Sequence, residues 1–229
     1  MKREFEIRRV SRVEACCRPL DWAWPKQNRA FVEENWKRRK AGTALMFNGR
    51  VLLLQDVAFE GDVCRNTYFE VDYADFVAWI DAGYPDPTIA NGFAMGALRG
   101  SDGAYICGVM VAGTANAGRV YFPAGTPDLS DLKPDGTVDL ATSLTRELAE
   151  ETGLSEGDYR VADEWIIVQR WSTRELSHGR TTTYAPALLG AVRQYRPLDV
   201  FDCSCRVDGL SQIQRWFQPT LLVGSCLQG

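Results

Sequence analysis

The sequence predicts an α/β protein built from two unlike parts. Three observations support this class. Segments with the alternation of β-strands lie between segments with helical spacing, the pattern changes near residue 90, and no internal repeat or low-complexity tract occurs. The 229 residues allow one large domain or two small ones. We expect a small N-terminal α+β domain over residues 1–91 and a second domain over residues 92–229.

The N-terminal part begins with helical and hairpin signals. Residues 31–42 have the pattern of an amphipathic helix that ends at a glycine. Residues 43–59 predict two strands joined at Asn48-Gly49, a dipeptide typical of tight hairpins. Residues 72–87 predict a second helix, with an aspartate near its start and a glycine and two prolines at its end.

The second part has more strand-like segments. Residues 93–113 predict a strand, a Ser-Asp-Gly turn and another strand, and residues 118–125 predict a third. A long loop over residues 126–138 leads into a helix. Residues 164–171 and 181–192 are strongly strand-like and flank a polar loop.

Composition limits the classes of partner and of site. With 45% hydrophobic residues the chain can form a sizeable core. A formal charge of -4 provides no general attraction to nucleic acid or to an anionic membrane, so neither is expected as a partner. The single histidine, His178, excludes a zinc centre with several histidine ligands.

Cysteine usage and the absence of long apolar runs predict a cytoplasmic protein. The seven cysteines are odd in number and form no CxxC motif, which favours reduced thiols. No apolar run approaches the ~20 residues of a membrane span, and the first ten residues lack the apolar centre of a signal peptide.

The helix after the long loop has clear predicted ends. Asp139 is a favourable N-cap, and Gly153 is a favourable C-terminal stop. Four residues between them recur at helical spacing and are expected to form the buried stripe: Ala141, Leu144, Leu148 and Thr152.

Three glutamates gather on one side of this helix. Glu147, Glu150 and Glu151 fall within an arc of about 100°, and Glu151 projects only about 20° from Leu144 of the buried stripe. A solvent-facing charged helix with an Arg146–Glu150 pair is the plainer interpretation. However, like charges at this spacing repel each other, and the helix has no lysine. Divalent cations would turn the repulsion into attraction, because Mg²⁺ prefers carboxylate oxygens and water.

The segment RELAEETGL, residues 146–154, resembles the helical half of the box that defines the Nudix hydrolases. The pattern of that box is G-x5-E-x7-R-E-U-x-E-E-x-G-U, where U is aliphatic. Every defined position of its second half is matched, by Arg146, Glu147, Leu148, Glu150, Glu151, Gly153 and Leu154. The segment YFPAG also resembles the strand end and turn that open the box, which places Gly125 at its first glycine.

The first half of the box departs from the family pattern. Counting back from Arg146 over seven residues reaches Val138, where the family has a glutamate, and the loop after Gly125 is longer than the pattern allows. Four acids are candidates to replace the glutamate, and the sequence does not choose among them: Asp128, Asp131, Asp135 and Asp139.

The resemblance implies a Nudix fold, a mixed sheet sandwiched between helices, over about residues 92–229. It implies hydrolysis of a nucleoside diphosphate linked to another moiety, with Mg²⁺ or Mn²⁺ as cofactor. Glu147, Glu150 and Glu151 would be metal ligands together with the carbonyl of Gly125, and Arg146 would orient a box glutamate. Arg146 and the three glutamates form the expected catalytic set, while the catalytic base is left unassigned.

The N-terminal part is similar to the segment that precedes the Nudix domain in UDP-sugar diphosphatases, over residues 35–54 and 67–83. This similarity suggests a nucleoside diphosphate sugar as substrate. We expect the N-terminal part to complete the substrate pocket or a homodimer interface. The alternative function is a catalytically silent Nudix-like module that binds a nucleotide or a protein, and Val138 and the altered loop make it plausible.

Three other features have a functional and a structural interpretation. Arg180 is a candidate phosphate contact or a turn residue before a strand, and His178 is a candidate general base or a solvated loop residue. Trp22 and Trp24 could stack on a nucleobase, but anchoring of the N-terminal segment in a core is the favoured interpretation.

Overall fold

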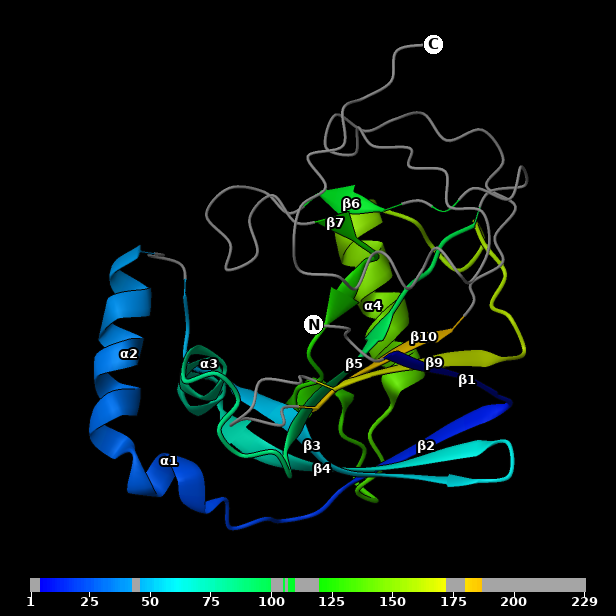
Figure 1. Ribbon diagram of the computed structural model, residues 1–229. Coiled ribbons are helices and arrows are strands. Elements are labelled where there is room, and N and C mark those ends of the chain that lie inside the picture. Colours follow the sequence, from blue (N-terminus) through cyan, green and yellow to red (C-terminus); the bar gives the residue numbers. More distant parts are fainter. Residues whose placement is uncertain are drawn as a thin grey trace.

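A computed structural model describes most of the chain as a mixed sheet with helices on both faces (Figure 1). The residues described are 5–42, 46–99, 105, 107–109, 120–171 and 180–186. The predicted α/β class with a mixed sheet is confirmed.

The strands of the main sheet come from both parts of the sequence. In spatial order they are β1 (Phe5–Val10), β9 (Trp165–Trp171), β10 (Arg180–Pro186), β5 (Ala90–Met95), β3 (Arg50–Glu60), β4 (Val63–Asp72) and β2 (Arg12–Cys17). β8 (Ala124–Gly125) also pairs with β5. The β10–β5 and β2–β4 pairs are parallel, and the other pairs are antiparallel. A second, small sheet joins β6 (Gly108–Val109) to β7 (Val120–Tyr121).

Five helices accompany these strands. They are α1 (Ala23–Gln27), α2 (Arg29–Gly42), α3 (Tyr73–Asp81), the 3₁₀ helix η1 (Leu129–Asp131) and α4 (Leu140–Thr152), counted over the described residues.

The sheet bends so that its two edges meet at Ser11. This residue alone separates β1 from β2, which lie at opposite ends of the strand order. Val10 pairs with Trp165 of β9, and Arg12 pairs with Val63 of β4. One N-terminal stretch therefore forms both edges of the sheet, and the sheet curves around α4.

The two faces of the sheet have separate cores. Leu52 and Leu54 of β3 belong to one core and Leu53 to the other, and each is at most 1% exposed. The core of Leu52 and Leu54 contains Leu144 and Leu148 of α4. The core of Leu53 contains side chains of α3. Helix α4 is therefore held by strands from both parts of the sequence.

Trp22 anchors the segment before α1. It is 7% exposed, lies edge-on to Phe69 and Trp79 of the α3 core, and donates an Nε1–H···O hydrogen bond of 2.9 Å to Asp86. The favoured interpretation of Trp22 as a core anchor is confirmed. Its neighbour Trp24 is partly buried and stacks against it.

Most predicted elements are confirmed, but the hairpin at Asn48-Gly49 is wrong. The strand after it, β3, forms its hairpin with β4 across Gly61 and Asp62. Asn48 and Gly49 instead satisfy the start of α3, where Asn48 Oδ1 accepts from the Ala74 N–H and the Gly49 carbonyl accepts from the Tyr73 N–H. Turn-forming residues such as Asn and Gly can connect two strands or accept hydrogen bonds at the start of a helix. In this protein Asn48 and Gly49 accept hydrogen bonds at the start of α3.

The predicted boundary between residues 91 and 92 lies within β5. Strands from both sides of this boundary share main-chain hydrogen bonds in one sheet. The division into two domains, residues 1–91 and 92–229, stays a prediction.

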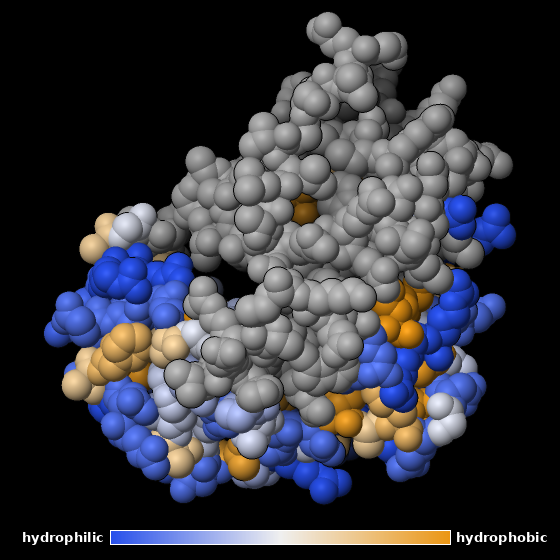
Figure 2. Space-filling model, in the orientation of Figure 1, coloured by the Kyte–Doolittle hydropathy of each residue, from blue (hydrophilic) through white to orange (hydrophobic). Residues whose placement is uncertain are grey.

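The structure also describes the polarity of the surface, the state of several cysteines and the character of the helices. The described part of the face in Figure 2 is mostly hydrophilic, with smaller hydrophobic areas. The cysteines for which the structure gives a state, Cys16, Cys17, Cys64 and Cys107, are free thiols. Over the described ranges, no helix has the length and apolar character needed to cross a membrane.

Candidate active site

The loop before α4 is fastened to strands of the N-terminal part. The Leu52 N–H donates to the Pro127 carbonyl at 2.7 Å, which ties the start of the loop to β3. The Cys17 N–H donates to the Gly136 carbonyl at 2.8 Å, and the Val138 N–H donates to the Ala15 carbonyl at 2.9 Å. These bonds extend the edge of the sheet at β2 and fold the loop back over it.

Within this loop, η1 holds Asp131 in a buried position. Asp128 caps η1 through its side chain, which accepts from the Ser130 N–H at 2.7 Å. In return, the Asp128 N–H donates to Asp131 Oδ2 at 3.0 Å, which completes a capping box. The Asp131 side chain is only 2% exposed. A carboxylate buried to this degree needs a cationic partner and several donors.

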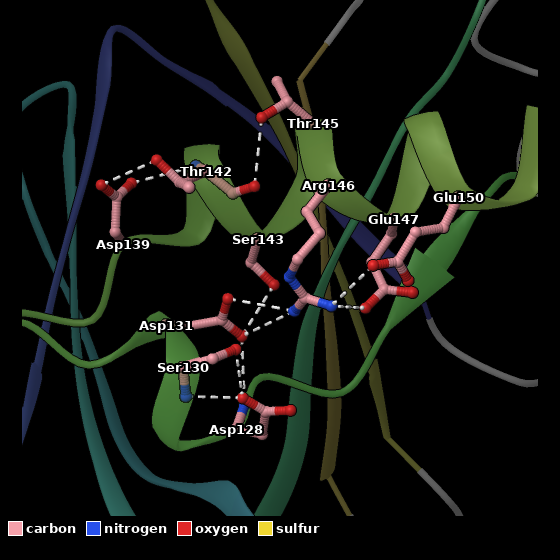
Figure 3. A network of polar contacts seen from close by, with 10 residues as sticks. All are labelled: Asp128, Ser130, Asp131, Asp139, Thr142, Ser143, Thr145, Arg146, Glu147 and Glu150. Atoms are coloured by element: carbon pink, nitrogen blue, oxygen red, sulfur yellow. Dashed lines mark hydrogen bonds and ion pairs between the residues drawn. The ribbon is translucent and has the colours of Figure 1, made fainter. Parts of the chain in front are cut away.

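Arg146 is that partner, and it links the loop to the glutamates of α4 (Figure 3). Its Nη2 lies 3.1 Å and 3.3 Å from the two carboxylate oxygens of Asp131. Its Nη1 lies 2.9 Å from Glu147 Oε1 and 3.8 Å from Glu150 Oε1. The Arg146–Glu150 pair of the plainer interpretation is thus present, but it is the longest of these contacts.

The three glutamates differ in burial, as their positions in the arc predict. Glu150 has a side chain that is 62% exposed, whereas Glu147 is 17% exposed. Burial is the main cause that raises the pKa of Glu147, against the lowering effect of Arg146. Burial, followed by the charge of Glu147, raises the pKa of Glu151 to about 7, although a hydrogen bond from the Ala124 main chain lowers it. Two carboxylates of α4 are therefore held where their negative charge is unfavourable without a cation.

The predicted buried stripe of α4 needs one correction. Leu144, Leu148 and Thr152 are buried, but Ala141 is exposed and Leu140 is buried at 4%. Leu140 lies four residues before Leu144 and therefore continues the same row along the helix.

Gly125 lies directly against Glu147. A Cβ built on Gly125 would lie 2.3 Å from both Cδ and Oε1 of Glu147. Any other residue at this position would push the carboxylate away. Since β8 also pairs with β5, the predicted metal-ligating glycine and glutamate are brought together by the sheet.

The structure shows which of the four candidate acids pairs with Arg146: it is Asp131. Counting forward from Gly125 over five residues reaches Asp131, so the extra residues lie between Asp131 and Arg146. Val138, reached by counting backward, is 3% exposed and belongs to the apolar core around α4. Asp131 was one of the four acids considered for the position of the box glutamate. Counting five residues forward from Gly125 was the signal in the sequence that would have selected it.

The other three acids have local structural contacts. Asp128 caps η1, and Asp135 accepts from the Thr137 N–H at 2.9 Å. Asp139 is the N-cap of α4, where it accepts from the Thr142 N–H at 3.0 Å. Partial burial acts to raise the pKa of Asp139, but hydrogen bonds from Lys133 and Thr142 outweigh it and leave the pKa lowered.

We expect Asp139→Asn to leave the melting temperature nearly unchanged and to reduce Mg²⁺-dependent turnover by less than ~10-fold, because asparagine caps a helix about as well as aspartate. Asp139→Ala should cost ~1 kcal/mol of stability. Thermal unfolding and paired Mg²⁺ titrations of the wild type and Asp139→Asn would check this. A large rise in the Mg²⁺ concentration for half-maximal rate, at an unchanged melting temperature, would instead make Asp139 a ligand.

The donors beside Gly125 suit a hard divalent cation. Over the described residues, no three histidine, cysteine, aspartate or glutamate side chains are already gathered closely enough to hold a metal ion. The oxygen chemistry of Glu147, Glu150 and Glu151 nevertheless matches what Mg²⁺ and Mn²⁺ prefer. The close contact with Gly125 places a main-chain carbonyl near the Glu147 carboxylate, and a cation there would lower the raised pKa values of Glu147 and Glu151.

Two predicted candidates cannot be placed. His178 lies outside the described residues, and only the main chain of Arg180 is described, as the first residue of β10. Their functional interpretations stay predictions.

Comparisons with known proteins give a limited result. No protein-family model matches the chain, and no curated protein matches it. The MutT protein from Methanosarcina mazei Go1 is 17% identical, with a TM-score of 0.29, over 52% of this chain and 73% of its own. RenU, a Nudix hydrolase from M. smegmatis, is 18% identical, with a TM-score of 0.27, over 46% of this chain and 68% of its own. At such TM-scores the likeness carries no argument, and function must be inferred from the site.

Proposed function

We propose that this protein is a Nudix-type hydrolase that depends on a divalent metal and cleaves the diphosphate linkage of a nucleoside diphosphate joined to another moiety. One observation carries the proposal. Two half-buried carboxylates of α4, Glu147 and Glu151, have raised pKa values, and the Glu147 carboxylate lies against Gly125, where a Cβ would displace it. A cation bound between these carboxylates would offset the cost of their negative charge, and Mg²⁺ prefers such oxygen ligands.

The residues of the site would act mainly by binding and orienting. Glu147, Glu150 and Glu151 would hold Mg²⁺ or Mn²⁺ with the carbonyl of Gly125. When bound, such an ion neutralises charge on phosphoryl oxygens and lowers the pKa of a bound water. Arg146, held by Asp131, would keep the Glu147 carboxylate beside Gly125.

Substrate and partners belong to the same proposal. A nucleoside diphosphate sugar is the first substrate to test, because of the similarity of the N-terminal segment to that of UDP-sugar diphosphatases. A homodimer and a cytoplasmic location are further parts of the proposal, and neither nucleic acid nor membrane is proposed as a partner.

The test is phosphate release from a panel of nucleoside diphosphate derivatives, with and without Mg²⁺. We expect turnover that requires Mg²⁺ or Mn²⁺ and stops in excess EDTA. Activity that survives EDTA would count against the proposal. Tight nucleotide binding without turnover across the panel would favour the silent binding module, for which Val138 and the altered loop are the support.

The raised pKa of Glu151 predicts a pH-dependent stability of the metal-free protein. The pKa of Glu151 is about 7 in the folded protein, against an ordinary value of 4.5. The contribution of this side chain to the free energy of unfolding is therefore most favourable below pH 4.5, where it is protonated, and this stability is lost as the pH rises through 7. Glu151→Gln should not lose stability in this way, because glutamine stays neutral as the pH rises. Because solvent screens a half-exposed group, we expect the variant to gain about 1 kcal/mol at pH 8, or about 2–4 °C in Tm.

Thermal unfolding in EDTA at pH 4.5 and pH 8 would check this expectation. The difference between the variant and the wild type should be small at pH 4.5 and should appear at pH 8. Added Mg²⁺ should raise the Tm of the wild type more than that of the variant. An equal difference at both pH values would show that the charge of Glu151 is not the cause.

A further inference from the structure

The Asp131 carboxylate has a neutral donor from α4 in addition to Arg146. The Ser143 hydroxyl donates to Asp131 Oδ2 at 3.0 Å, and the Asp128 N–H donates to the same oxygen, also at 3.0 Å. Ser143 is 2% exposed, and Asp131 is 3% exposed. The hydrogen bond from Ser143 to Asp131 is therefore made away from solvent. If it were lost, water could not readily replace the missing donor to Asp131 Oδ2.

These two donors determine how Asp131 faces Arg146. Both reach Oδ2, which fixes the plane of the carboxylate and turns Oδ1 toward Arg146 Nη2 at 3.1 Å, while the same nitrogen lies 3.3 Å from Oδ2 (Figure 3). Arg146 makes this contact through one nitrogen and uses the other, Nη1, for Glu147 at 2.9 Å. The guanidinium is thus shared between a buried acid on the loop and a half-buried acid on α4.

The division of Arg146 between two acids matters for a cation at Glu147. A guanidinium that moves away from Asp131 has Glu147 and Glu150 as its remaining acidic contacts. Its positive charge would then compete more strongly for the oxygens that a divalent ion needs. Holding Asp131 in one orientation limits this competition.

We infer that Ser143 is a positioning residue, which acts through Asp131 to hold Arg146 in an orientation that leaves the Glu147 carboxylate available to a divalent cation. The inference rests on the proposed function. It adds a residue at a position that the box pattern leaves undefined, about one helical turn before Arg146. The role is carried by the hydroxyl, so threonine at this position should retain it.

The experiment measures binding of Mn²⁺ by the electron paramagnetic resonance signal of free Mn²⁺, with no substrate present. We expect Ser143→Ala to raise the Kd for Mn²⁺ about 10-fold, since partners that orient a ligand typically change metal affinity by this much when they are lost. Ser143→Thr should restore the affinity. Thr145→Val is the matched control, because Thr145 lies on the same helix and its hydroxyl donates to the Thr142 carbonyl of that helix (Figure 3).

A double-mutant cycle tests the route through Asp131. Asp131→Asn keeps the shape of the side chain and removes its charge, so it should weaken Mn²⁺ binding by itself. Adding Ser143→Ala to Asp131→Asn should then have little further effect, because the group through which Ser143 acts is already neutral. Melting temperatures of all four proteins show whether each is folded.

The outcomes separate this inference from the proposed function. If the wild type binds Mn²⁺ and Ser143→Ala lowers only the melting temperature, the role is structural and the inference is wrong. Fully additive effects of Ser143→Ala and Asp131→Asn on Kd would also overturn it. If the wild type binds no Mn²⁺, the proposed metal site fails, and the inference fails with it.

Discussion

Glu151→Gln is expected to lower kcat by at least ~100-fold at saturating Mg²⁺ while the protein stays folded, because the variant loses a carboxylate from the proposed metal site. Glu151 is half-buried, its pKa is raised to about 7, and its partner on β8 is a main-chain N–H that glutamine can still satisfy. The change therefore removes charge with little change of shape.

Steady-state kinetics with the substrate identified in the panel would measure this effect. Glu156→Gln is the matched control, since Glu156 is exposed and lies just beyond the end of α4. Near-normal turnover of Glu151→Gln at saturating Mg²⁺ would remove Glu151 from the metal site. A matching loss in Glu156→Gln would point to a general effect of charge.

The second large effect concerns the N-terminal part. We expect a truncated chain that begins at Asn91 not to form a stable fold, because it lacks β1 to β4 and α1 to α3. Leu144, Leu148 and Ile167 would lose Leu52 and Leu54 from their shared core. Burying one leucine contributes about 1.5–3 kcal/mol, so the loss of such contacts removes a large part of the roughly 5–15 kcal/mol by which domains are usually stable.

The same truncation would release the loop that carries Asp131. The bonds from Leu52 to Pro127 and from Val138 to Ala15 would both be absent. Circular dichroism and size-exclusion chromatography would check the fold of the fragment. Mixing it with residues 1–90 provides the control, and recovery of a cooperative transition is expected. A monodisperse fragment that melts cooperatively alone would show that residues 92–229 are an independent domain.

The sequence alone determined the features that depend on a single helical turn. The limits of α4 follow from the cap at Asp139 and from Gly153, which adopts the left-handed conformation with φ of 73°. The partial burial of Glu147 and Glu151 follows from 100° per residue, because Leu144 and Leu148 must face the core. These features involve neighbours within about four residues, so the sequence pattern contains all the information needed.

The tertiary structure decided everything that depends on which strands pair. Alternating apolar residues predict a strand but not its partner, so the sharing of one sheet across residue 91 could not be predicted. Asn48-Gly49 suits a hairpin or a helix start equally, and only the position of α3 selects the second. The pairing of Asp131, rather than another of the four acids, with Arg146 also depends on long-range contacts. Main-chain hydrogen bonds to β2 and β3 fold the loop back. This folding brings Asp131 to Arg146 and places Val138 in the core.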